Sequence, residues 1–148
     1  MSASEVRHAG LIAARSNGPW RGVLIEGEAG AGKSDLALQA LAAGFRLVAD
    51  DRVMLWISAG RLYGRAPDAL GGLIEVRGLG IAALNAVPLA EVVLAVRAGT
   101  PERMPDPAFI DILGLRVPAL VLDLREPSAP AKLSHALSRF DGGSNRRI

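Results

Sequence analysis

The stretch at residues 27–34 constrains this chain more than any other part of its sequence. It reads Gly-Glu-Ala-Gly-Ala-Gly-Lys-Ser and fits G-x-x-x-x-G-K-[ST], the phosphate-binding P-loop. The apolar segment before it, residues 22–26, predicts a short strand. Residues 35–41 after it carry apolar side chains at helical spacing, and Gly44 makes a suitable stop. A strand, a glycine loop and a helix let backbone N–H groups and the positive helix end face one anion.

The P-loop interpretation assigns a role to each polar group in the stretch. Lys33 would reach the β- and γ-phosphates of a nucleotide, and the Ser34 hydroxyl would bind Mg²⁺. Only Lys33 and Lys132 are lysines among 17 basic residues, so a lysine in the slot that needs a compact ammonium is informative. The alternative is a glycine-rich turn with a solvated lysine. The predicted phosphate-binding residues are Gly27, Glu28, Ala29, Gly30, Ala31, Gly32, Lys33 and Ser34.

Composition limits the classes of protein that remain. The 148 residues predict one domain over 1–141 with a disordered tail over 142–148, and half of them are hydrophobic with only 4% aromatic, so an aliphatic core is expected. No basic stripe with aromatic residues accompanies the net charge of +2, which argues against nucleic acid. The absence of cysteine excludes disulfides, thiolate catalysis and zinc-thiolate sites. No apolar run approaches the ~18 residues of a membrane span, so a soluble cytoplasmic protein is expected.

Two adjacent carboxylates, Asp50 and Asp51, close the next predicted strand over residues 45–49. An apolar strand that ends in acid is typical of the metal-side carboxylate of P-loop enzymes, and such a group can serve as a base. The alternative is a turn-initiating Asp pair. Residues 5–15 are expected to form a hairpin with the strand at 22–26 that brings His8 alongside it. Taken alone, His8 is better explained as a surface or structural histidine.

The remaining pattern predicts a mixed sheet with flanking helices. Residues 53–57 and 61–64 flank a turn and form a hairpin, so some pairing is antiparallel. Residues 73–81 are expected to be extended, with Glu75 and Arg77 opposite Ile74 and Val76, and glycines 78 and 80 indicate either a close backbone approach or unusual dihedral angles. Further expected elements are strands at 92–96 and 117–124, the second ending near Asp123, and a C-terminal helix at 131–140 with one apolar face. The fold class is therefore α/β, with a P-loop in a mixed sheet.

Three segments together resemble one known family. They are residues 27–38, residues 44–51 and the Glu-Val-Arg-Gly-Leu-Gly-Ile sequence at 75–81. The combination is similar to the catalytic domain of the HPr kinase/phosphorylase family, which acts on a serine of a small phosphocarrier protein. The segment at 75–81 is far more specific to that family than the P-loop. The resemblance is clear over residues 22–81 and thin beyond residue 100.

This resemblance implies an ATP- and Mg²⁺-dependent serine kinase that acts on an HPr-like phosphocarrier of the phosphotransferase system. His8 corresponds to a histidine before the P-loop strand, with a longer turn here. Asp50 corresponds to the general base, with Asp51 beside it. Glu75 corresponds to a second acid on the Mg²⁺ side, so that Ser34 and Glu75 form the implied metal site. Arg103, in a short local match, corresponds to an arginine that assists transfer.

Two departures from the family pattern concern the ends of the chain. The separate N-terminal domain of longer members has no counterpart, so the sequence resembles a short single-domain form. Residues 127–132, which include Lys132, fall where the family has a loop used in dephosphorylation. They lack its glycine- and arginine-bearing sequence, so the resemblance implies kinase activity more strongly than phosphorylase activity. The family forms hexamers, which implies a homo-oligomer here.

Three other functions fit parts of the sequence. Residues 111–114 match the D-x-x-G pattern of GTPases, but the N-K-x-D guanine motif is absent. A small-metabolite kinase would phosphorylate a free hydroxyl compound and ignore protein serines. A nucleotide-dependent sensor or interaction protein would keep the P-loop and turn over little.

Overall fold

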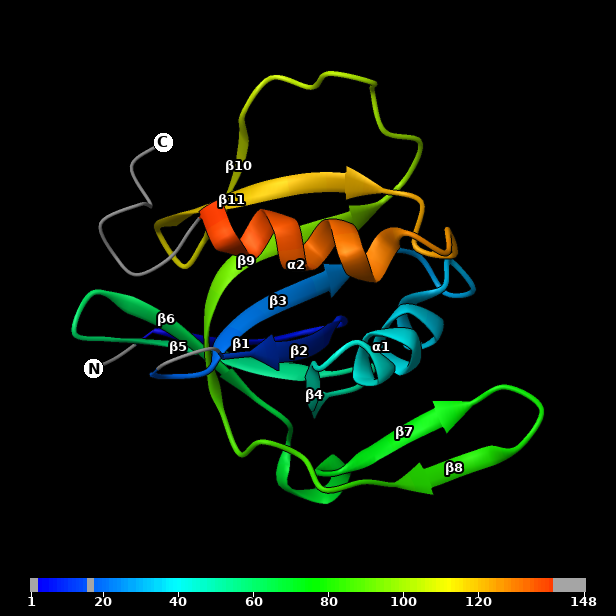
Figure 1. Ribbon diagram of the computed structural model, residues 1–148. Coiled ribbons are helices and arrows are strands. Elements are labelled where there is room, and N and C mark those ends of the chain that lie inside the picture. The colour runs from blue at the N-terminus through cyan, green and yellow to red at the C-terminus, as the bar shows by residue number, and fades with distance from the viewer. Residues whose placement is uncertain (1–2, 16–17, 140–148) are drawn as a thin grey trace.

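The computed structural model describes residues 3–15 and 18–139, and two helices pack on one face of a large sheet within it (Figure 1). The helices are α1 (Lys33–Ala42) and α2 (Ala129–Arg139), and a short 3₁₀ helix spans Asp68–Leu70. The strands of the large sheet are β1 (Ser4–Arg7), β2 (Gly10–Ala14), β3 (Arg21–Glu26), β4 (Arg46–Ala49), β5 (Val53–Ser58), β6 (Arg61–Arg65), β9 (Ala90–Ala98), β10 (Ala108–Ile112) and β11 (Leu115–Leu122). A separate hairpin consists of β7 (Leu73–Val76) and β8 (Gly80–Ala83).

The large sheet is mixed, as the sequence predicts. Its order is β1-β5-β6-β9-β3-β2-β4 in the described part of the chain. Strand β6 pairs with the first residues of β9, and β11 pairs with the last residues of β9. The central strand β9 is parallel to β3 and to β11. The hairpins β2–β3, β5–β6 and β10–β11 are antiparallel. The expected hairpin with the P-loop strand is therefore confirmed for Gly10–Ala14, whereas Ser4–Arg7 is a separate strand that pairs with β5.

Apolar side chains cover both faces of the sheet, which explains why its central strands are continuous hydrophobic runs. On β3, Val23 and Ile25 point to the face that carries both helices, where they join Leu36 of α1 and Leu133 of α2. Leu24 points to the opposite face, into a second cluster with residues of β2, β5 and β9. The strand that leads into the P-loop is thus fixed from both sides.

The prediction of one extended segment over residues 73–81 is wrong. The chain is extended only to Val76, then turns and returns as β8, so these residues form the β7–β8 hairpin beyond α1 (Figure 1). Gly78 and Gly80 have φ angles of 86° and 110°, in the region that favours glycine, and they reverse the chain. The prediction of unusual dihedral angles at the two glycines is confirmed.

The C-terminal part departs from the prediction in smaller ways. Strand β10 was not predicted, and the D-x-x-G match at residues 111–114 is the end of β10 and its turn into β11. That turn precedes β11, so it lies at the opposite end of this strand from the edge where β3 meets the P-loop. The C-terminal helix begins two residues earlier than expected. Phe140 of its predicted apolar face and the predicted tail lie outside the described residues.

Candidate phosphate-binding site

The sheet topology brings the ends of β3, β4, β9 and β11 and the beginning of β2 to one edge. Because β9 is parallel to β3 and β11, their carboxyl ends lie together. Strand β2 is antiparallel to both β3 and β4, so its beginning and the end of β4 lie at the same edge. His8 precedes β2, the P-loop follows β3, Asp50 and Asp51 follow β4, and Arg125 follows β11. Loops after the carboxyl ends of strands are the usual ligand sites of open α/β sheets.

The P-loop holds its lysine against its own backbone. Lys33 is the first residue of α1 and is only 9% exposed. Its Nζ donates hydrogen bonds to the carbonyl oxygens of Gly27 (2.6 Å) and Glu28 (3.1 Å). Gly32 has a φ of 107°, so the turn from loop to helix needs a glycine there. The sequence pattern thus folds into a loop around a buried ammonium group, which can exchange these carbonyl partners for phosphate oxygens.

Ser34 and Asp50 are in direct contact beside this lysine. The Ser34 hydroxyl donates a hydrogen bond to Oδ1 of Asp50 at 2.8 Å, and the backbone N–H of Glu75 donates to Oδ2 at 3.1 Å. The β7–β8 hairpin therefore positions the same carboxylate that the P-loop helix contacts. The Ser34 hydroxyl and the Asp50 carboxylate thus lie side by side, and both are oxygen donors of the kind that Mg²⁺ prefers. Glu75 contacts this pair through its backbone N–H.

Asp51 points away from this pair and toward His8. Nε2 of His8 lies 3.3 Å from Oδ1 of Asp51, and both side chains are more than half exposed, at 54% and 57%. Asp51 has a φ of 70°, an uncommon value for a non-glycine residue that Asp tolerates better than most. This backbone angle turns two neighbouring carboxylates to different partners. The structure therefore brings His8 to the same edge as the P-loop, as predicted.

A pocket of about 180 Å³ lies over the P-loop and gathers most of the predicted site residues. Its lining residues are His8, Ala29, Gly30, Gly32, Lys33, Ser34, Asp35, Asp51, Glu75, Arg77 and Arg125. Arg125 was not predicted. The signal in the sequence is its place two residues after Asp123, the predicted strand-end acid. Lysine, arginine and hydroxyl donors converge on one small volume, which suits an oxyanion.

The predicted base Asp50 does not line this pocket, although it contacts Ser34, which does. Gly27, Glu28 and Ala31 line a second pocket.

Arg103 and Lys132 line neither of the two pockets beside the P-loop. Arg103 is exposed in the loop between β9 and β10. Lys132 lies in the first turn of α2, where its Nζ is 2.9 Å from Oε2 of Glu126. Residues 129–132, expected near a dephosphorylation loop, are helical. The structure thus separates both side chains from Lys33 and Ser34.

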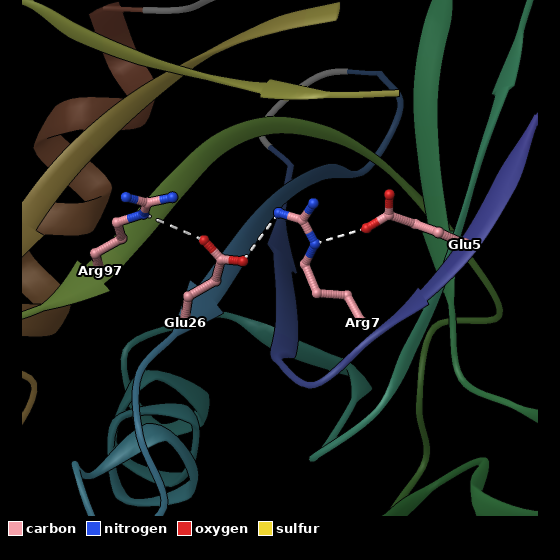
Figure 2. Close-up of polar contacts among 4 residues, drawn as sticks. All are labelled: Glu5, Arg7, Glu26 and Arg97. Atoms are coloured by element: carbon pink, nitrogen blue, oxygen red, sulfur yellow. Dashed lines mark hydrogen bonds and ion pairs between the residues drawn. The ribbon is translucent and has the colours of Figure 1, made fainter. Parts of the chain in front are cut away.

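A chain of ion pairs holds the strand end from which the P-loop starts. Glu26, the last residue of β3, contacts Nη1 of Arg7 at 3.0 Å and Nε of Arg97 at 3.4 Å, and Arg7 also contacts Glu5 at 2.7 Å (Figure 2). Burial by itself lowers the pKa of Arg7, but the hydrogen bond to Glu5 and the charges of Glu26 and Glu5 outweigh it, so this pKa is raised. The ends of β1, β3 and β9 are therefore joined electrostatically.

The second pocket, of about 680 Å³, lies along the other side of the P-loop. It is lined by Glu26, Gly27, Glu28, Ala31, Arg97, Ala98, Gly99, Asp123 and Leu124. Each pocket contains three carboxylates, but the small one also contains Lys33, Arg77 and Arg125, whereas Arg97 is the only lysine or arginine among the residues lining the larger one.

The strand–loop–helix geometry and the donors around it define a P-loop protein of the phosphate-binding class. Among protein families, the model of the HPr serine kinase C-terminal domain matches residues 2–93. The chain belongs to this family. Within the described residues, no helix is long and apolar enough to cross a membrane.

Individual relatives agree with this assignment. The chain is 40% identical over 117 residues to the HPr kinase/phosphorylase of Leptothrix cholodnii. This alignment covers 68% of this chain and 36% of that protein. It is 36% identical over 134 residues to the enzyme of the same name from Polaromonas naphthalenivorans, covering 80% and 42%. The chain thus spans roughly two fifths of the length of the curated relatives it matches.

A solved structure shares the fold over nearly the whole chain. The Hpr(Ser) kinase/phosphatase from Coxiella burnetii is 29% identical, with a TM-score of 0.74, and the match covers 93% of this chain and 99% of that one. The match therefore extends past residue 93, where the family model ends, and includes the part of the fold that carries β11 and α2.

Proposed function

We propose that this chain is an ATP- and Mg²⁺-dependent serine kinase whose substrate is an HPr-like phosphocarrier protein of the phosphotransferase system. The observation that carries the proposal is the contact between Ser34 and Asp50 beside the buried Lys33, in a chain of the HPr serine kinase C-terminal domain family. This contact places a carboxylate that accepts a hydrogen bond from a serine hydroxyl beside the lysine that we propose to bind phosphate.

The P-loop side of the site would bind the nucleotide. Backbone N–H groups of residues 27–34 and the Lys33 ammonium would contact the β- and γ-phosphates, because phosphoryl transfer depends mainly on positioning and charge stabilisation. Ser34 and Glu75 would hold Mg²⁺, with Asp50 next to them. The ion, when bound, supplies charge neutralisation to the phosphate oxygens.

The carboxylate side would activate the acceptor. The hydroxyl of the substrate serine would lose its proton to Asp50 as its oxygen attacks the γ-phosphorus, and the bond to the β–γ bridging oxygen would break with ADP as leaving group. Asp51 and His8 line the approach next to Asp50. A general base typically contributes about 10²–10⁴-fold to the rate.

The proposal also covers the direction of phosphoryl transfer, the cellular compartment and the oligomeric state. Phosphorolysis of phosphoserine by inorganic phosphate would need protonated Asp50 to return its proton. We propose the kinase direction as the main activity and phosphorolysis as a second activity of the same carboxylate. Residues 129–132, in the segment that the resemblance links to dephosphorylation, are helical, and Lys132 pairs with Glu126. A cytoplasmic homo-oligomer, a hexamer by family resemblance, is the expected assembly.

Two alternatives make different predictions from the same pocket. A small-metabolite kinase would use the P-loop and Asp50 on a free hydroxyl compound. A nucleotide-dependent sensor would bind ATP and transfer nothing. Both share the phosphate site, so nucleotide binding alone does not distinguish them from the proposal.

The experiment is a transfer assay followed by intact mass and peptide mapping. The protein is mixed with Mg²⁺-ATP and an HPr-like phosphocarrier, and in parallel with a panel of small hydroxyl compounds. The proposal predicts phosphoserine on the carrier, and none with Lys33→Ala. Transfer to small compounds only would favour the metabolite kinase, and ATP binding without any transfer would favour the sensor. Either result would contradict the proposal.

A further inference from the structure

We infer that Arg7 is a positioning residue, which fixes His8 relative to the P-loop through its ion pair with Glu26. The effect on phosphoryl transfer rests on the proposed function, in which His8 lines the approach of the acceptor serine. The position of the His8 ring can be tested without it. Arg7 and Glu26 both lie outside the P-loop motif at residues 27–34.

His8 lies where the chain changes its pairing partner. Strand β1 ends at Arg7 and pairs with β5, and β2 begins at Gly10 and pairs with β3. His8 and Ala9 connect these two strands. The backbone N–H of Ala9 donates to the carbonyl oxygen of Asp51 at 3.1 Å, which holds the connection near the start of β5. The position of His8 toward the P-loop then depends on its other neighbour, Arg7.

Arg7 supplies a contact on the P-loop side. Its Nη1 lies 3.0 Å from Oε2 of Glu26 and its Nε lies 2.7 Å from Oε2 of Glu5, so the guanidinium group is held between two carboxylates (Figure 2). In the sheet, β5, β6 and β9 lie between β1 and β3. The contact between Arg7 and Glu26 therefore joins two strands that are not neighbours in the described sheet.

Glu26 is itself held in place. Its other oxygen, Oε1, lies 3.4 Å from Nε of Arg97, which is its direct partner in the parallel pair of β3 and β9. The next residue, Gly27, accepts the 2.6 Å hydrogen bond from Lys33. Arg7 is thus anchored to the strand end from which the P-loop starts, one residue before the carbonyl group that binds the Lys33 ammonium.

The side-chain contact of His8 is weaker than that of Arg7. Nε2 of His8 lies 3.3 Å from Oδ1 of Asp51, and both side chains are more than half exposed. A contact at such exposure contributes little, so it does not fix the ring by itself. The Arg7 side chain is only 24% exposed and has two carboxylate partners. The residue before His8 is therefore the stronger restraint on where the ring lies.

The consequence for catalysis follows from this geometry. His8 and Lys33 line the same pocket, and the pair of Arg7 and Glu26 links the residue before His8 to the strand end that leads to Lys33. A displacement of about 1 Å in an active site can cost about 10²-fold in rate. Loss of the pair would let His8 move away from the pocket, while the hydrogen bond between Lys33 and Gly27 remains.

The first test follows the His8 ring directly. The chain has two histidines, so His135→Gln leaves His8 as the source of the histidine signal in carbon–proton correlation spectra of the rings. In this background we expect Asp51→Asn to shift the His8 signal. Arg7→Met should move that signal toward its value in the unfolded chain and abolish the response to Asp51→Asn.

Three further variants make the spectra specific. Glu26→Gln removes the charge from the other side of the pair and should cause the same loss of response, also if Arg7→Met does not fold. Arg7→Lys keeps the charge but not the planar fork, so it should recover part of the response. Arg65→Met removes an exposed ion pair with Asp68 and should leave the His8 signal as in wild type.

A double-substitution cycle tests the effect on transfer. We expect Arg7→Met to slow transfer at saturating Mg²⁺-ATP by about 10–10²-fold, with little change in ATP affinity. In a His8→Ala background, Arg7→Met should cause no further loss, because Arg7 acts through His8. A purely structural defect would slow both backgrounds equally. Urea titration checks that each variant is folded under the assay conditions.

Either of two results would overturn the inference. A His8 signal that is unchanged in Arg7→Met and still responds to Asp51→Asn would mean that Arg7 does not position the ring. Additive losses in the cycle would mean that Arg7 affects transfer by another route. If wild type transfers phosphate to no carrier while the His8 signal behaves as expected, the proposed function fails and the positioning role of Arg7 stands.

Discussion

The two halves of the chain build the same site in different ways. In the first half, the predicted site residues are close together in the sequence. Lys33 donates a hydrogen bond to the carbonyl oxygen of Gly27 within the same loop, and Asp50, which contacts Ser34, follows the next strand. In the second half, no motif is visible, and residues 94–139 fall beyond the family model. Yet Arg125 from this half contacts both Gly30 and Asp35. The motif predicts where phosphate would bind, and the tertiary structure determines which other cations lie beside that loop.

The halves also depend on each other for stability. The apolar face of α2 packs in one cluster with α1 and with strands β2, β3 and β9, so the P-loop helix is held partly by the C-terminal helix. Burial of this kind, at about 25 cal/mol per Å² of apolar surface, is the main favourable term in folding. The second half therefore supports the first structurally, and Arg125 adds a direct contact with the P-loop.

The largest expected effect comes from the motif half. Lys33→Ala removes the buried ammonium that we propose to bind the phosphates, and the loss of charge-assisted bonds and of transition-state stabilisation should lower transfer at subsaturating ATP by about 10³–10⁵-fold. ATP titration and steady-state transfer rates measure both parts. Lys132→Ala is the matched control, since its pair with Glu126 is exposed, and its kinase rate should equal wild type. Similar losses in the two variants would contradict the assignment of Lys33.

The C-terminal half should show its largest effect in stability. Leu133 is fully buried in the cluster that joins α1 and α2, so Leu133→Ala should lower the free energy of unfolding by about 2–5 kcal/mol. Urea denaturation measures this change. Val121→Ala is the control, because Val121 is 45% exposed on β11 and its truncation should cost less than about 0.5 kcal/mol. Equal costs would mean that α2 does not support the core.

The smallest expected effect lies in the ion-pair chain before the P-loop. Arg7→Met removes the cation between Glu5 and Glu26, and the free energy of unfolding should fall by about 1 kcal/mol, because the pairs are only part-buried. The comparison variant is Arg65→Met, whose partner Asp68 is 92% exposed, and its effect should be close to zero. The same urea titrations apply. A larger loss in Arg65→Met would show that burial does not set the strength of these pairs.

Sequence reasoning succeeded where structure is local. The P-loop, its flanking strand and helix, and the hairpins around residues 10–26 and 53–65 follow from short-range patterns, and the structure confirms each. The carboxyl-end position of Asp50 also followed, because strand and acid are adjacent in the chain. These features require no knowledge of strand order.

The features that could not be predicted from the sequence depend on the backbone angles of two glycines and on the order of the strands in the sheet. Residues 73–81 alternate like a single strand, but positive φ angles at Gly78 and Gly80 fold them into a hairpin. Arg125 could not be recognised without knowing that β11 runs parallel to β9, which places its carboxyl end beside the P-loop. Sequence spacing does not contain this pairing.

The most direct test of the account is a single-turnover measurement on Asp50→Asn, with Asp51→Asn as its matched partner. If Asp50 accepts the proton of the substrate serine, Asp50→Asn should bind Mg²⁺-ATP nearly as well as wild type and transfer phosphate about 10²–10⁴-fold more slowly. Asp51→Asn, which loses only an exposed contact with His8, should show a smaller decrease. Transfer by Asp50→Asn at a near-normal rate, or a greater loss in Asp51→Asn, would contradict the assignment of Asp50 as the base.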